Sequence, residues 1–171
     1  MQWTAVIPAA GLGKRMRALT GGAPKEMLLL GGKPVLQWAI DEAKDSGASE
    51  VVVVLSEEKR EVAEQLAGQP GIRFEWQPFP GGMGHAVVCA RCNPPVFVIV
   101  GDTLYWPESP LSQLAAKVES VADACISLET VGDSEVSQYG VAELVGDRVA
   151  RLLEKPKASE TESRSAIDGR Y

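Results

Sequence analysis

Short apolar runs alternate with residues at helical spacing along the first 130 residues, and this alternation constrains the fold more than any other feature. Residues 4–8 and 51–55 are apolar or β-branched and too short for helices, so they predict buried strands. Between them, apolar residues recur at helical spacing over 35–43, with Pro34 at the expected start and Gly47 at the expected end. A strand, a helix and a second strand in this order form a βαβ unit, which predicts a parallel sheet.

The alternation continues after this unit. Further helices are predicted over 57–66, 84–92 and 111–121, and further strands over 72–76, 96–100 and 124–128. Repeated βα units of this kind predict an α/β fold with a doubly wound, mostly parallel sheet.

The pattern changes after residue 130. Short strands are predicted over 139–144, 149–153 and 166–171, with a polar loop over 157–164. A chain of 171 residues is predicted to be one domain, 1–171, with a βα part (1–130) and a strand part (131–171). Because the sequence stops inside a predicted strand, we expect more of the fold to follow residue 171.

The charge is negative overall but unevenly distributed. The chain has 17 Lys and Arg against 23 Asp and Glu, a net charge of −6, which disfavours nucleic acid as a partner. Residues 1–40 nevertheless carry five positive side chains against one carboxylate, that of Glu26. This imbalance predicts a focused site for a small anion.

Two features of the sequence bear on location. No apolar run approaches the roughly 18 residues that a membrane helix needs. The first positive residues, Lys14 and Arg15, follow the apolar N-terminal stretch, whereas a secretory signal has them before it. We therefore expect a soluble, cytoplasmic protein that does not bind a membrane.

Cys89 and Cys92 form a C-x-x-C pair. A zinc site needs a second pair or a histidine cluster, and the sequence has neither. We interpret both residues as reduced cysteines on a helix.

The strongest local motif is the glycine loop at 9–15, directly after the first predicted strand. Gly11 and Gly13 allow the backbone to approach a phosphate and to turn its N–H groups toward it. The loop is neither a Walker A motif, because Arg15 follows Lys14, nor a full G-x-G-x-x-G, because Met16 takes the third glycine position. A tight turn remains the alternative, but the Lys–Arg pair suits a polyphosphate.

A second loop, 77–86, contains three glycines before a predicted helix. Gln77 offers both a donor and an acceptor, which suits the edge of a nucleobase. An ordinary Gly/Pro loop is the alternative. His85 is the sole histidine and has no neighbouring nucleophile in the sequence, so we interpret it as structural.

Asp102 follows the apolar strand predicted over 96–100. A carboxylate at this position is costly to hold unless it is paired or binds a cation, and Mg²⁺ is the natural partner where phosphates are near. The alternative is a side chain that caps the next turn. Glu154 and Lys155, with Tyr139 and Gly140, form a pattern that on its own is typical of a surface ion pair.

Taken in order, these motifs resemble the sugar-phosphate nucleotidyltransferase family, and within it most closely the bacterial uridylyltransferases that use UTP and glucose 1-phosphate. The resemblance covers the whole chain, and its residues keep their spacing. They are AVIPAAGLG at 5–13 with Arg15 and Met16, PKEML at 24–28, KP at 33–34, GMGHAV at 82–87, YGV at 139–141, EKP at 154–156 and GRY at 169–171.

The resemblance implies an enzyme with a Rossmann-like nucleotidyltransferase fold of the glycosyltransferase-A type. An NTP and a sugar 1-phosphate would give a nucleotide-sugar and pyrophosphate, with Mg²⁺ as cofactor and no covalent enzyme intermediate. On this reading, residues 1–130 would be the nucleotide-binding part and residues 131–171 an incomplete sugar-phosphate-binding part. A homo-oligomer and a monomer are both left open.

The resemblance also implies roles for single residues. The nucleotide would be held by Ala9, Ala10, Gly11, Gly13, Arg15, Lys25, Gln77 and Gly82, with the base read by the last two. Arg15 and Lys25 would act on the phosphates, and Asp102 would be the Mg²⁺ ligand. The sugar phosphate would be held by Tyr139, Gly140, Glu154 and Lys155.

Three departures limit the resemblance. Lys14 stands where the family has Thr. Gly101 and Asp102 resemble the thymidylyl and adenylyl branches as much as the uridylyl branch, so dTTP, CTP, ATP or GTP with another sugar phosphate is an alternative. Family members continue past this point and supply a second metal-binding Asp there. A truncated, non-catalytic nucleotide-binding module is therefore a further alternative.

Overall fold

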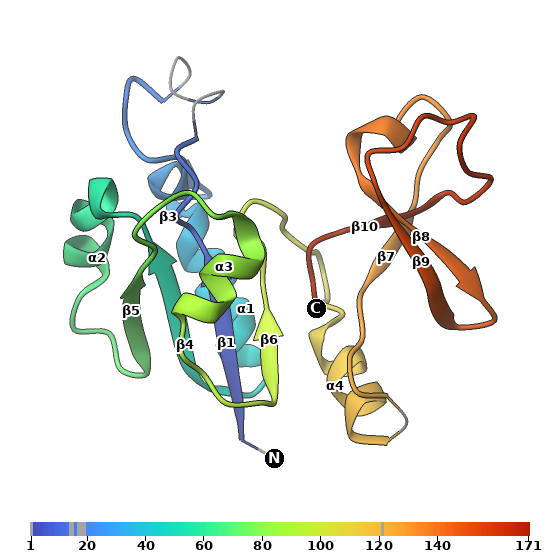
Figure 1. Cartoon of the computed structure of the whole chain (residues 1–171). Coiled ribbons are helices and arrows are strands. Elements are labelled where there is room, and N and C mark those ends of the chain that lie inside the picture. Colours follow the sequence, from blue (N-terminus) through green and yellow to red (C-terminus); the bar gives the residue numbers. More distant parts are fainter. Residues whose placement is uncertain (1, 14–15, 17–19, 121) are drawn as a thin grey trace. The chain divides into compact units, whose positions relative to one another are not determined.

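The structure is a computed structural model that describes residues 2–13, 16, 20–120 and 122–171 (Figure 1). The chain divides into two compact units, Met1–Gln113 and Leu114–Tyr171.

The first unit is built on a parallel sheet of four strands. These are β1 (Trp3–Pro8), β4 (Ala48–Leu55), β5 (Ile72–Trp76) and β6 (Val96–Val98), in the spatial order β5-β4-β1-β6. The central strands pair in parallel along their length, with Val6 opposite Val52. Both strands are apolar because both faces of the sheet are covered. The predicted α/β fold with a doubly wound, mostly parallel sheet is confirmed.

Helices cover the two faces of this sheet. Helix α1 (Val35–Asp45) buries four apolar residues at helical spacing, Leu36, Ala39, Ile40 and Ala43. It begins after Pro34 and ends before Gly47, which has a φ of 92°. Helix α3 (Gly82–Cys89) packs on the opposite face, and Figure 1 shows it in front of the sheet with α1 behind.

The predicted helix over 57–66 is divided in two. A short 3-10 turn, η2 (Glu57–Lys59), precedes α2 (Arg60–Leu66). The division falls at Lys59, whose φ of −114° and ψ of 28° are not helical. The first unit also contains the turn η1 (Lys25–Met27) and the short strands β2 (Leu29–Leu30) and β3 (Lys33–Pro34). Helix α4 (Leu111–Ser120) crosses the boundary between the units.

The second unit contains an antiparallel sheet. Its strands are β7 (Leu128–Thr130), β8 (Gly140–Val145), β9 (Arg148–Glu154) and β10 (Ser165–Ile167), in the order β7-β10-β8-β9, with the turn η3 (Val136–Gln138) before β8. Its small core consists of Val131, Val136, Val141 and Ala166. The short strands predicted for this part of the chain are confirmed, although the last one is shorter than expected.

Several predicted boundaries were wrong. The strand expected over 124–128 is instead β7, which begins at Leu128 and pairs with β10. The backbone N–H of Ser127, just before it, donates to the carbonyl of Arg170. The helix expected over 84–92 begins at Gly82 and ends at Cys89. Arg91 has a φ of 52°, so Cys92 lies beyond the helix. The strand expected over 96–100 ends at Val98. In the described part of the chain, no helix combines the length and the apolar character that crossing a membrane requires.

Candidate active site

The glycine loop leaves the sheet at the carboxyl end of β1, where open α/β sheets bind their ligands. Ala9 and Ala10 are buried, whereas Gly11 is exposed. The N–H of Ala9 donates to the carbonyl of Val54 at 2.8 Å, which attaches the start of the loop to β4. Gly13 has a φ of 58°, a left-handed conformation that glycine adopts without strain. The predicted phosphate-binding residue Arg15 lies outside the described residues.

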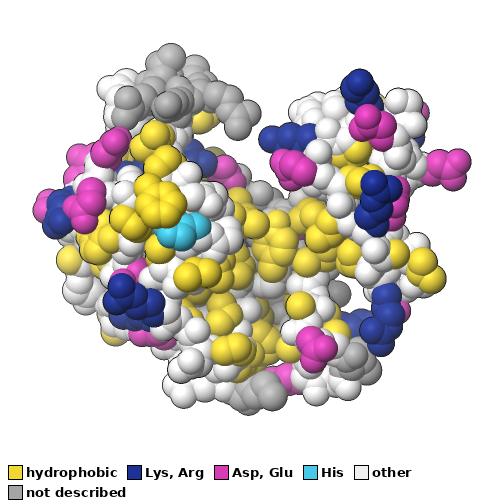
Figure 2. All heavy atoms as spheres, viewed as in Figure 1, with side chains coloured by type: hydrophobic (Ala, Val, Ile, Leu, Met, Phe, Trp, Pro, Cys, Tyr) yellow, Lys and Arg dark blue, Asp and Glu magenta, His cyan; other side chains and the backbone are white. Residues whose placement is uncertain are grey.

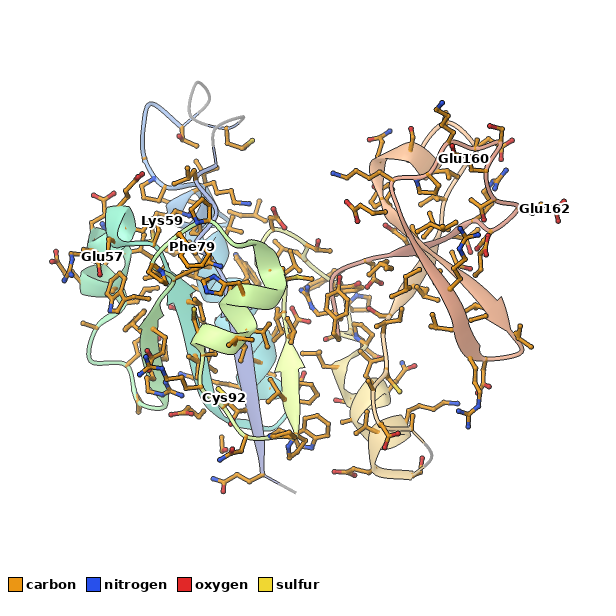
Figure 3. The ribbon with its side chains drawn as sticks, viewed as in Figure 1. Glu57, Lys59, Phe79, Cys92, Glu160 and Glu162 are labelled. Atoms are coloured by element: carbon orange, nitrogen blue, oxygen red, sulfur yellow. The ribbon has the colours of Figure 1, made fainter. Side chains whose placement is uncertain are left out.

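A buried lysine, Lys59, forms hydrogen bonds to the backbone of this loop. The Nζ of Lys59 donates to the carbonyl oxygens of Ala9 at 2.7 Å and Gly11 at 2.5 Å, and to Oε1 of Glu26 at 2.8 Å. The side chains of Lys59 and Glu26 are only 8% and 6% exposed. Lys59 comes from η2, near the end of the sheet where Phe79 also lies (Figure 3).

This contact between the glycine loop and the segment that carries Lys25 was not predicted from the sequence. Lys59 lies in a polar stretch whose pattern predicts a surface helix, and Glu26 enters only as part of the PKEML motif. A long-range contact of this kind has no local sequence signal.

Two of the predicted catalytic residues are in direct contact. The Nζ of Lys25 donates to Oδ2 of Asp102 at 2.6 Å, although the two residues are 77 positions apart. Lys25 lies in η1, and Asp102 lies in the turn after β6. The Asp102 side chain is 54% exposed, so it is open to a ligand. A cavity of about 380 Å³ is lined by both residues and by Ala9, Leu36 and Gly101, among others.

Asp102 fits a magnesium ion that is held mainly by phosphate oxygens. Among the described residues, no group of three or more His, Cys, Asp and Glu side chains gathers to form a complete metal cage. Mg²⁺ in phosphate-transfer sites uses one or two carboxylates and takes its other ligands from water and phosphate. The exposed Asp102 carboxylate, beside Lys25 and in the cavity that Ala9 also lines, is such a donor.

The second predicted loop lies at the same end of the sheet. The N–H of Gln77 donates to the carbonyl of Leu55 at 2.8 Å, one residue after the carbonyl that binds Ala9. The Gln77 side chain is buried, and its Nε2 donates to the carbonyl oxygen of Gly82 at 2.9 Å. The structure thus brings together Gln77 and Gly82, the two residues assigned to the base. They lie at the carboxyl end of the sheet, where the glycine loop also lies.

His85 packs against this pair. Its ring stacks on Phe79 with 4.3 Å between ring centroids, and its Nδ1 lies 3.0 Å from Nε2 of Gln77. Figure 2 shows hydrophobic side chains gathered around the cyan histidine on this face. His85 therefore makes its contacts with Phe79 and Gln77, which agree with the structural role predicted from the sequence.

The four residues assigned to the sugar phosphate lie together in the second unit. Gly140 pairs with Glu154 across β8 and β9, and the N–H of Lys155 donates to the carbonyl of Tyr139 at 3.1 Å. Lys155 has a φ of 48°, and its Nζ lies 3.8 Å from Oε1 of Glu154. A Cβ on Gly140 would lie 3.2 Å from Ile167 and 3.6 Å from the Glu154 carboxylate, so a side chain has little room there.

The cysteines are free thiols. Burial raises the pKa of the Cys92 thiol, and the nearby Arg73 guanidinium only partly opposes this effect. A thiol whose pKa is raised reacts slowly as a nucleophile.

The chain is similar to known proteins over nearly its whole length. The model of a family described as nucleotidyl transferase matches residues 4–171. The UTP–glucose-1-phosphate uridylyltransferase YngB of Bacillus subtilis is 31% identical, in an alignment that covers 98% of this chain and 68% of that protein. A UTP–glucose-1-phosphate uridylyltransferase of Staphylococcus haemolyticus is also 31% identical, with 98% and 70% covered.

Solved structures are similar as well. A UDP-glucose pyrophosphorylase complexed with UDP-glucose is 26% identical, with a TM-score of 0.84 and 99% of this chain and 75% of that chain covered. A UTP-bound UGPase from Acinetobacter baumannii is 25% identical, with a TM-score of 0.84 and 100% and 74% covered.

Proposed function

Because this chain belongs to the nucleotidyl transferase family, we propose that it joins UTP to glucose 1-phosphate, giving UDP-glucose and pyrophosphate. The names of the two uridylyltransferases and the ligands of the two solved structures support this choice of substrates. Both proposed substrates are charged phosphates that do not cross membranes unaided, so we place the reaction in the cytoplasm.

The proposed reaction requires positioning and charge neutralisation. A phosphate oxygen of glucose 1-phosphate attacks the α-phosphorus of UTP in line. A new P–O bond forms, and the bond between the α-phosphorus and the bridging oxygen breaks to release pyrophosphate. No side chain has to become covalently attached, and cations and N–H donors around the phosphates lower the barrier.

The contact between Lys25 and Asp102 is the single observation that carries this proposal. It sets a cation and an anion at 2.6 Å beside the glycine loop, at the carboxyl end of the parallel sheet. In the proposed complex, the Lys25 ammonium turns from Asp102 to the phosphates and neutralises their charge. Arg15 is proposed to hold the leaving pyrophosphate. Ala9, Ala10, Gly11 and Gly13 are proposed to face the nucleotide with their backbone.

Lys59 supports the loop in this role. It draws the carbonyl oxygens of Ala9 and Gly11 toward its own ammonium. These carbonyls therefore do not present their negative ends to a triphosphate.

Asp102 is the proposed ligand of Mg²⁺, and the ion when bound would supply positive charge to the phosphates between which the bond breaks. Gln77 and Gly82 are proposed to read the uracil. In the second unit, Glu154 and Gly140 are proposed to bind the glucose hydroxyls, with Tyr139 beside them and Lys155 on the phosphate.

A pyrophosphate-release assay tests the proposal. The chain is incubated with Mg²⁺, UTP and glucose 1-phosphate, and controls lack either the sugar phosphate or the metal. We expect release only in the complete mixture. Release without glucose 1-phosphate would indicate hydrolysis, and binding of UTP without any turnover would indicate a non-catalytic nucleotide-binding module.

The same assay tests the choice of substrates. We expect UTP to give a higher kcat/KM than dTTP, CTP, ATP or GTP with glucose 1-phosphate. Galactose 1-phosphate and mannose 1-phosphate serve as the sugar controls. A better rate with another base or sugar would keep the reaction class and replace the proposed substrates.

A further inference from the structure

The amide of Gln77 has both of its N–H donors in use inside the protein. Nε2 lies 2.9 Å from the carbonyl oxygen of Gly82 and 3.0 Å from Nδ1 of His85. A backbone carbonyl can only accept a hydrogen bond, so the nitrogen end of the amide must face Gly82. This contact shows which way the amide points in the structure, independently of any assignment of its oxygen and nitrogen atoms.

The same geometry fixes the proton of His85. Because Nε2 of Gln77 donates its second hydrogen toward Nδ1, that ring nitrogen must accept. This arrangement requires the neutral tautomer of His85 with its proton on Nε2, the ring nitrogen that lies 3.7 Å from the sulfur of Cys89.

The ring of His85 has little freedom to leave this position. Phe79 stacks on one of its faces with an interplanar angle of 20°. Gly81 approaches so closely that a Cβ there would lie 2.6 Å from Nδ1. The acceptor that holds the second N–H of Gln77 is thus held in place by its own neighbours.

We propose that His85 is a positioning residue that fixes the Gln77 amide so that only Oε1 is offered to the base, and that this selects uracil and thymine over cytosine. The inference rests on the proposed function, in which Gln77 reads the base of the nucleotide. Uracil and thymine carry a hydrogen on ring nitrogen N3 that can donate to Oε1. Cytosine has a lone pair at N3, which Oε1 repels.

Without His85, the Gln77 amide loses one of the two acceptors that hold its nitrogen. Only the carbonyl of Gly82 then holds the nitrogen end, so the amide turns more readily and can donate to cytosine N3. The discrimination between the two bases weakens as a result. A site that leaves a polar group of the wrong ligand unpaired discriminates strongly, and a site that can adapt does not.

Two variants test the proposal. His85→Phe keeps an aromatic ring against Phe79 and removes the acceptor, whereas His85→Asn keeps an acceptor in the position of Nδ1. The measurement is kcat/KM for UTP, dTTP and CTP, each with glucose 1-phosphate. We expect His85→Phe to lower the UTP-to-CTP ratio about tenfold or more, since a misplaced buried donor or acceptor has an effect of this order.

The control is built into the choice of nucleotides. The UTP-to-dTTP ratio should stay unchanged in His85→Phe, because uracil and thymine present the same N3–H. His85→Asn should retain most of the UTP-to-CTP ratio. General damage to the fold would lower all three rates together and leave both ratios as they are.

The outcomes separate this inference from the proposed function. A native chain that does not prefer UTP to CTP contradicts the proposed function. A native chain that prefers UTP, with an unchanged UTP-to-CTP ratio in His85→Phe, overturns the role of His85. If that variant does not fold, the ¹⁵N chemical shifts of His85 in the native chain decide. A proton on Nδ1 at neutral pH overturns the proposal, and a proton on Nε2 alone supports it.

Discussion

Lys59 shows how much a single side chain can contribute to the candidate site without touching a substrate. A charged ammonium is rarely buried unless it is fully paired, because leaving water is costly. Lys59 is paired three times, with two carbonyls of the glycine loop and the carboxylate of Glu26. One residue therefore connects the loop after β1 to the segment that carries Lys25.

We predict that Lys59→Met lowers the free energy of unfolding by about 3–5 kcal/mol, because it leaves the Glu26 carboxylate buried without its cation. Urea denaturation measures the change. The matched control is Lys33→Met, which removes a half-exposed lysine paired with Asp41. It should change the free energy by no more than about 1 kcal/mol. Equal effects of the two variants would contradict the role given to Lys59.

Asp102 is a second single residue whose proposed role can be tested by substitution. We predict that Asp102→Asn lowers kcat/KM at least about 100-fold, equivalent to ~2.7 kcal/mol of transition-state stabilisation. The variant should also need more Mg²⁺ for half-maximal activity. Because the Asp102 side chain is 54% exposed, its ion pair with Lys25 contributes about 1 kcal/mol or less to stability, and the thermal transition should hardly move.

Asp41→Asn is the control for this variant. Asp41 is also a part-exposed carboxylate bonded to a lysine, Lys33, at 2.5 Å, but it has no proposed role in the reaction. Its loss should leave kcat/KM within about twofold of the native value. A similar loss of activity in both variants would show that the effect is not specific to the metal site.

At the level of whole elements, local patterns predicted most of the first unit. The apolar runs of β1 and β4 and the helical spacing of α1 follow from burial alone, so they are visible in the sequence. The start of α3 is not, because Gly82 enters the helix with a φ of 82° that only a glycine adopts freely. The place of β7 depends on pairing with β10, which is distant in sequence.

The residues of the candidate site were likewise predicted only in part. Lys25, Asp102 and Gln77 were predicted as site residues from local patterns and from the family resemblance, and the fold places their segments at the carboxyl end of the parallel sheet. Lys59 and the link between Gln77 and His85 were not predicted. Both depend on the exact approach of side chains from separate segments, which no spacing rule describes.

Helix α3 provides a prediction at this scale. Gly84 lies in its first turn, and a Cβ there would meet no atom within 4 Å. Gly84→Ala should therefore raise the free energy of unfolding by about 0.5–1 kcal/mol in the ligand-free chain, since glycine weakens a helix. Gly81→Ala should lower it by about 1–3 kcal/mol, because its Cβ would collide with His85. Denaturant titration compares the two, and the opposite order of stabilities would be inconsistent with the packing of α3.

At the level of the whole molecule, each of the two units is proposed to bind a different substrate. The residues proposed for the nucleotide belong to Met1–Gln113, and those proposed for the sugar phosphate belong to Leu114–Tyr171. The predicted division into a nucleotide-binding part, 1–130, and a sugar-phosphate-binding part, 131–171, therefore remains a proposal.

Chemical-shift mapping tests this division. Titration with UTP should shift the backbone amide signals of Gly11 and Gln77 most strongly. Titration with glucose 1-phosphate should instead shift those of Gly140 and Lys155. Strong shifts by both ligands in one unit only would contradict the proposed division.

One further consequence follows from the anchoring of Ala9 and Gln77 on neighbouring carbonyls of β4. The strands that carry them flank β4, so the two anchors are separated by two strand spacings, roughly 10 Å. The distance between Ala9 and Gln77 is therefore set by the strand pairing, and it limits the size of any molecule that contacts both. Insertions in the loops that follow these two residues should leave this distance unchanged, whereas a shift of β4 in register against one neighbour would alter it.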